Sequence, residues 1–80
     1  MNTTLTAKDE RMINHFMVLT AEINDIRTYG YDSEAQEKAN SLVNTARRTM
    51  YEMSPEANRI ARAQHMLEFG KDWSLVVEGK

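Results

Sequence analysis

Apolar residues recur at steps of three and four along most of this chain, which is the spacing of one face of an α-helix. The first such series consists of Met12, Phe16, Leu19, Ile23 and Ile26. It predicts a helix over residues 6–29. Thr6 is a suitable residue to cap the start of this helix, and Gly30 is a suitable residue to end it.

A second helix is predicted over residues 33–53, after a connector of a few residues. Its inner face consists of Ala35, Ala39, Leu42, Ala46, Met50 and Met53. The alanines allow a close approach to a bulkier neighbour, and the first helix supplies bulk through residues such as Phe16 and Leu19. Because a short connector favours antiparallel neighbours, we expect these two helices to form a hairpin.

The start of a third helix is the clearest local signal in the chain. Ser54 is a suitable cap, and Pro55 fits the first helical position, where its missing N–H costs nothing. We expect this helix to cover residues 55–77 and to lie at an angle to the hairpin. The sequence therefore predicts an all-α fold, a three-helix bundle, as a single domain over residues 1–80.

Gly70 is a candidate break in the third helix. Glycine either caps the helix there or lies within a continuous helix at a cost of about 0.5–1 kcal/mol relative to alanine. The helical spacing of Phe69, Trp73 and Val76 favours the continuous helix.

The third helix carries a second apolar series without an obvious partner within the chain. Its members are Met66, Phe69, Trp73 and Val76. An exposed patch of this kind is rare on monomers, so it predicts a protein interface, and a homodimer is one form of it. Alternatively, Trp73 folds back over the open end of the hairpin near Ile13 or Met17.

Composition limits how the fold can be stabilised and where in the cell the protein is expected. The chain has 80 residues, a formal net charge of −2 and no cysteine, so no disulfide is available as a staple. Oligomerisation is then the simplest remaining way to stabilise a fold with so small a hydrophobic core. The N-terminus does not resemble a signal peptide, and no segment is long and apolar enough for a membrane span, so we expect a soluble, cytoplasmic protein without a membrane partner.

Few residues suggest catalysis. The glycines are isolated, so no phosphate-binding loop is present, and no cysteine is available as a nucleophile. His65, Glu68 and Asp72 share one helix face at spacings that suit a metal or acid–base site, but a solvated polar face with a part-buried histidine is the favoured explanation. We therefore predict a protein that is not an enzyme and uses no cofactor and no metal.

Basic residues gather where the second and third helices meet. They are Arg47, Arg48, Arg59 and Arg62, with Tyr51 between the two pairs. Arginine binds phosphate bidentately and stacks on bases, so this corner is a candidate site for a nucleotide or nucleic acid. The alternative is a set of surface salt bridges to Glu52 and Glu56.

The apolar surplus on the third helix favours a small non-enzymatic interaction protein that binds another protein. In size, methionine content and lack of catalytic residues, the chain resembles the small accessory proteins of phages and mobile elements. That resemblance implies an inhibitor or adaptor of a host protein. Binding of a nucleotide or nucleic acid at the arginine corner is the alternative function.

Overall fold

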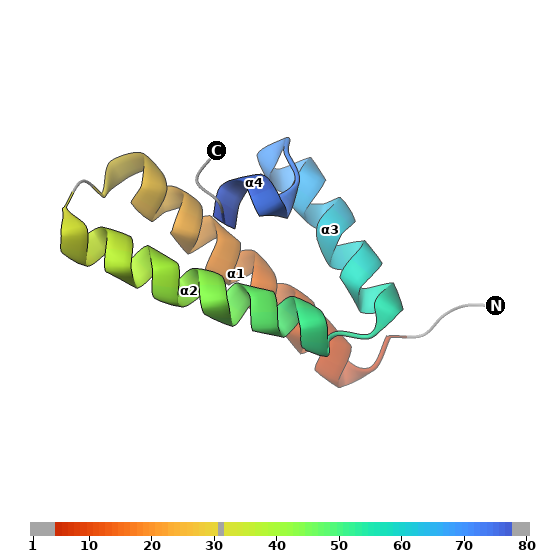
Figure 1. Cartoon of the computed structure of the whole chain (residues 1–80). Helices are drawn as coiled ribbons and strands as arrows, with labels where there is room; N and C mark the ends of the chain where they lie inside the picture. The colour runs from red at the N-terminus through yellow and green to blue at the C-terminus, as the bar shows by residue number, and fades with distance from the viewer. Residues whose placement is uncertain (1–4, 31, 78–80) are drawn as a thin grey trace.

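The computed structural model describes residues 5–30 and 32–77, and all regular structure in these residues is helical (Figure 1). The helices within them are α1 (Ala7–Tyr29), α2 (Ser33–Glu52), α3 (Pro55–Phe69) and α4 (Trp73–Val77). The predicted all-α fold is confirmed, with a fourth helix that the sequence did not predict as separate.

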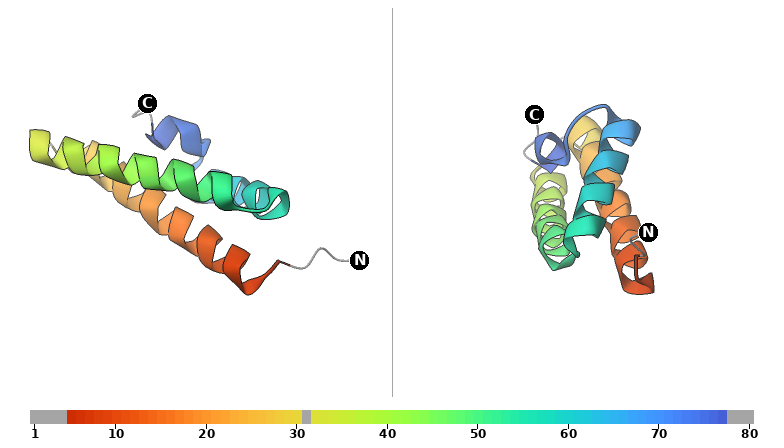
Figure 2. Two further views of the ribbon diagram at one scale, coloured as in Figure 1. Left: turned by 60° about the horizontal axis from the view of Figure 1, so that its bottom comes forward. Right: turned by 90° about the vertical axis from the view of Figure 1, so that its right-hand side faces the viewer.

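α1 and α2 form the predicted antiparallel hairpin, and the pair diverges from one end to the other. The two helices lie close at the connection after Tyr29 and separate toward the start of α1, as the left view of Figure 2 shows. At the connection, a Cβ added to Gly30 would lie 2.8 Å from the Ile26 carbonyl oxygen and 2.9 Å from the Ala35 Cβ. We call this end the tip and the opposite end the splayed end.

Side-chain caps begin the three long helices. Thr6 Oγ1 accepts the Asp9 N–H at 3.0 Å and Ser54 Oγ accepts the Ala57 N–H at 3.1 Å, as their positions predicted. α2 begins at Ser33, as predicted, and is capped by Asp32, whose Oδ1 accepts the Ala35 N–H at 2.8 Å. The helix starts are therefore set by local hydrogen bonds from capping side chains, and such caps can be predicted from the sequence.

The prediction that the third helix continues through Gly70 is wrong. Gly70 has φ 74° in the left-handed region, and its N–H donates to the Met66 carbonyl at 2.9 Å. A residue without a Cβ adopts this conformation without strain, so the chain ends α3 and turns back. Asp72 then accepts the Ser74 N–H at 3.2 Å at the start of α4.

α1 is the central helix, and α2, α3 and α4 all pack against it. The bulky residues that α1 buries are Ile13, Phe16, Leu19 and Ile23. α3 buries Ala57, Ala61 and His65 rather than its larger apolar residues. Because the alanines bring α3 close to α1, the ring of Phe16 fills much of the space between the helices.

Arg27 links the tip to the end of α4. Its guanidinium donates to the Val77 carbonyl at 3.0 Å and to Gln36 Oε1 at 3.3 Å, while the Gln36 amide donates to the Gly30 carbonyl at 2.8 Å. Arg27 on α1 therefore joins α1 to α2 and α4.

Candidate functional site

The residues predicted as a protein interface do not form one exposed surface. α4 folds back over α1, where the rings of Trp73 and Phe16 meet edge to face with centroids 5.7 Å apart. Val76 is only 2% exposed, so its predicted place on an exposed surface is wrong. Met66 is 48% exposed and Phe69 is half-buried. The separate α4 explains this result, because it uses the last apolar residues to cover the core.

His65 lies in the core between aromatic rings, and not on a solvated face. Its ring centroid is 4.4 Å from that of Phe69 and 6.2 Å from that of Phe16. Nδ1 lies 2.8 Å from the Lys71 carbonyl oxygen and donates to it in the neutral ring, whereas Nε2 is buried without a hydrogen-bond partner among the described residues. Burial lowers the pKa of His65, against the opposing effects of the Lys71 carbonyl and the Asp72 carboxylate.

The suggested metal or acid–base site at His65 gains no support from this arrangement. Asp72 accepts hydrogen bonds from Ser74 and lies 3.7 Å from the guanidinium of Arg62, and both interactions lower the pKa of its carboxyl group. Within residues 5–30 and 32–77, no group of three metal-ligating side chains is placed to hold an ion. His65 and Asp72 therefore act here as structural groups that fix the turn between α3 and α4.

A shallow groove follows the contact between α1 and α3, and we call it the seam. One depression of about 360 Å³ is lined by Asn14, Met17, Val18, Ala21, Gln64, Glu68 and Phe69. A second, of about 180 Å³, continues it past Asn14 and Gln64 to Glu10 and Leu5. Val18 is 63% exposed, and Leu67 beside the seam is 88% exposed. The two depressions thus meet at the polar Asn14 and Gln64, and each half of the seam combines apolar side chains with one carboxylate, Glu68 or Glu10.

The predicted corner of arginines divides between two faces of the molecule. Arg47 and Arg62 line a cavity of about 210 Å³ with Tyr51 and Trp73, which we call the corner cavity. Arg48 instead faces the opposite side of α2. Arg59 forms an ion pair with Glu56, as the salt-bridge alternative proposed. The corner cavity therefore has only two of the arginines, and Asp72 already pairs with Arg62.

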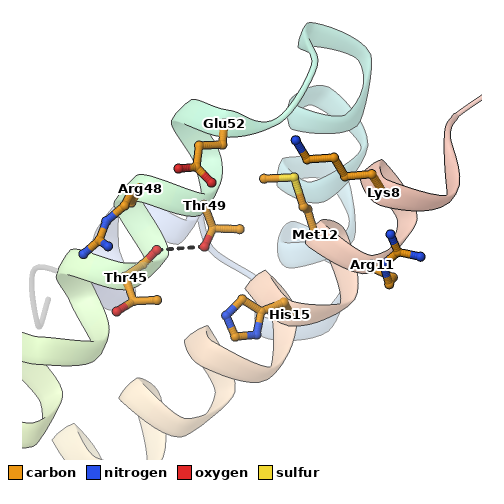
Figure 3. Close-up of a pocket in the computed structure, with 8 residues that line it drawn as sticks. All are labelled: Lys8, Arg11, Met12, His15, Thr45, Arg48, Thr49 and Glu52. Carbon is orange, nitrogen blue, oxygen red and sulfur yellow. Dashed lines mark hydrogen bonds between the residues drawn. The ribbon is translucent and has the colours of Figure 1, made fainter.

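Arg48 belongs to a different and larger depression, which we call the basic groove (Figure 3). It lies between the first half of α1 and the last half of α2 and has a volume of about 400 Å³. Its lining residues are Lys8, Arg11, Met12 and His15 from α1, with Thr45, Arg48, Thr49 and Glu52 from α2. The groove opens at the splayed end, where the two helices have separated.

Sequence reasoning missed the basic groove, although the signal was present. Lys8, Arg11 and His15 recur at steps of three and four and so share a face of α1. Arg48 and Glu52 are four residues apart on α2. What periodicity does not supply is the angle at which the two helices diverge, and that angle decides whether the two faces enclose a space.

No family model, curated protein or solved structure matches this chain. In the described part of the chain, no helix has the length and apolar character that crossing a membrane requires. The seam and the basic groove are the two surfaces whose geometry bears on function.

Proposed function

We propose that this chain is a small non-enzymatic interaction protein that binds another protein through the seam. The observation that carries the proposal is the exposure of Val18 and Leu67 beside a continuous groove between two helices. Large apolar side chains that gather on the surface along a groove are typical of sites that receive a partner helix. An inhibitor or adaptor of a host protein is the role that we propose for such a chain.

The seam favours a particular kind of partner. One half of the seam offers Met17, Val18 and Phe69 beside Glu68, and the other half carries Glu10. An amphipathic helix with an apolar face and a lysine or arginine facing each half complements this arrangement. A second copy of the chain would bring its own carboxylates to the same surface, so the homodimer stays a prediction that the seam does not favour.

The test compares binding by wild type with binding by two seam variants, Val18→Asp and Leu67→Asp. Both positions are exposed, so circular dichroism and melting temperature should change little. Asn44→Asp, which adds the same charge on an exposed position of α2, is the matched control. The partner is captured from lysate of the source cells, purified, and titrated against each variant by calorimetry.

We expect each seam variant to bind the purified partner at least about tenfold more weakly, because a carboxylate is then buried in an apolar contact. The Asn44→Asp control should bind as the wild type does. Light scattering of the isolated chain tests the homodimer, and a dimer that Val18→Asp disrupts would make the partner a second copy. Equal affinity of wild type and both seam variants would show that the seam is not the binding surface.

A further inference from the structure

We infer that the basic groove is a binding site for a small phosphorylated molecule of the nucleotide or sugar-phosphate class. This site is separate from the seam, because it lies between α1 and α2 rather than between α1 and α3. Its volume of about 400 Å³ falls in the range of small-molecule sites. The inference does not depend on the proposed protein partner.

The groove concentrates positive charge in a chain whose formal net charge is −2. Lys38, Arg59 and Arg62 form ion pairs, and none of these three lines the groove. Lys8, Arg11 and Arg48 form no ion pair with any described residue. These three side chains are thus available to an anionic ligand from two sides.

Lys8 places its ammonium group in the groove, and an arginine flanks the groove on each side. In Figure 3, Lys8 and His15 extend from α1 toward the space between the helices, whereas the guanidinium groups of Arg11 and Arg48 lie at the outer rims formed by α1 and α2 and point away from that space. An arginine guanidinium binds two phosphate oxygens at once, and a lysine ammonium adds a mobile point charge. The groove therefore offers a lysine within it and arginines at its rims, whose long side chains can turn toward a bound phosphate.

The remaining lining residues favour a ligand that carries hydroxyl groups as well as phosphate. Glu52 presents a carboxylate that accepts hydrogen bonds but repels a bare anion. Because the hydroxyls of Thr45 and Thr49 donate to the carbonyls of Ser41 and Thr45 at 3.3 and 2.8 Å, their oxygens are left to act only as acceptors. Sugar hydroxyls supply the donors that these groups need, whereas inorganic phosphate at neutral pH supplies few.

The test is calorimetric titration at low salt with ribose 5-phosphate, adenosine 5′-monophosphate and inorganic phosphate. We expect both esters to bind more tightly than inorganic phosphate, and ribose without phosphate not to bind. Tighter binding of the nucleotide than of the sugar phosphate would identify a nucleotide as the ligand, and equal binding would identify a sugar phosphate. Amide chemical shifts on α1 and α2 that move during the titration would locate the ligand.

Variants connect the binding to the groove. Lys8→Ala and Arg48→Ala should each weaken ester binding by about tenfold, the effect of losing one charge-assisted hydrogen bond. Lys38→Ala, which removes a cation from the exposed face of α2, is the matched control for Lys8→Ala and should leave binding within about twofold. Glu52→Ala should reduce the preference for ribose 5-phosphate over inorganic phosphate.

Three results would overturn the inference. One is the absence of binding by either ester at millimolar concentration. Another is an equal loss of affinity in Arg47→Ala and Arg48→Ala, because Arg47 lines the corner cavity on the other side of α2. The third is binding of a single-stranded oligonucleotide with a steep salt dependence but of neither ester, since that result would indicate a nucleic-acid surface.

Discussion

The two ends of the α1–α2 hairpin are built from the same pair of helices but differ in spacing and in chemistry. At the tip, Gly30 and Ala35 allow the backbones to meet closely, and Arg27 and Gln36 join the connection to both helices by hydrogen bonds. At the splayed end, the helices separate and the basic groove opens between them.

The difference follows from the size of the side chains along α2. Toward the tip, its buried residue is Ala39, whereas toward the splayed end it buries Thr49 and Met50, and Met53 follows the helix. Larger residues hold α1 farther away, and α3 then packs on the other face of α1. A hairpin thus gains a stable contact at one end and a ligand-sized space at the other without any change of fold.

The largest effect is expected from Phe16→Ala, which removes the ring that fills the space between α1, α3 and α4. Phe16 is fully buried and contacts the rings of His65 and Trp73. Its loss should lower the free energy of unfolding by about 3–5 kcal/mol, measured by urea denaturation. Val18→Ala on the exposed face of α1 is the control and should have little effect. A loss below about 1 kcal/mol for Phe16→Ala would show that this part of the core readily repacks.

The second prediction concerns the close contact at the tip. In Gly30→Ala, the added Cβ would meet the Ile26 carbonyl and the Ala35 side chain, and overpacking of this kind costs about 1–3 kcal/mol. Gly70→Ala is a useful contrast, because its Cβ would meet nothing within 4 Å but would hold a left-handed conformation, which costs alanine about 1–2 kcal/mol.

Ala35→Gly distinguishes the two causes when it is combined with each glycine variant. It should relieve part of the cost of Gly30→Ala, which is steric, and none of the cost of Gly70→Ala, which is conformational. If thermal unfolding shows that the stability changes of the single variants simply add in both double variants, the tip contact is looser than the distances indicate.

The third prediction compares the helix caps at the two ends. Ser54 at the splayed end caps α3 and also donates to Asp9 Oδ2 at 3.0 Å, which joins the starts of α1 and α3. The side chain of Asp32 near the tip makes only its cap hydrogen bond among the described residues. Loss of a cap costs about 0.5–2 kcal/mol, so Ser54→Ala should lie toward the upper part of that range and Asp32→Ala toward the lower part. The reverse order in urea denaturation would contradict the link between α1 and α3.

Sequence patterns predicted the helices well but located the sites poorly. Thr6, Ser54 and Pro55 signal helix starts through local hydrogen bonds and backbone preference, which act within a few residues. Gly70 was misinterpreted because apolar spacing is the same whether a helix continues or a second one folds back. Only the backbone conformation at that residue distinguishes the two.

The buried face of α3 shows a second limit of sequence patterns. Hydropathy favours Leu67 for burial, yet Leu67 is exposed while Ala57, Ala61 and His65 are buried. Small residues at a contact between helices allow the two backbones to pack closely. A histidine can be buried there because its ring N–H donates a hydrogen bond to a carbonyl, here that of Lys71. These are properties of the packed pair of helices, so the sequence of one helix does not reveal them.

The last prediction uses His65 to separate the α3–α4 region from the tip by pH. Because burial lowers its pKa below the ordinary value of 6.5, the unfolded chain binds a proton more readily than the folded chain does. The contribution of neutral His65 to stability is therefore complete above pH 6.5 and is lost as the pH falls below that value. The melting temperature should drop between pH 7 and pH 5 in a buffer without phosphate, and His65→Gln should make this decrease smaller. His15→Gln, at an exposed position of α1, is the matched control and should keep the full decrease in melting temperature.

Amide hydrogen exchange should show faster opening of α4 at acid pH while the tip keeps its protection, because the Lys71 carbonyl that His65 binds lies just before α4. Equal loss of protection at the tip and in α4 would mean that the chain unfolds as one unit and that His65 controls no separate region.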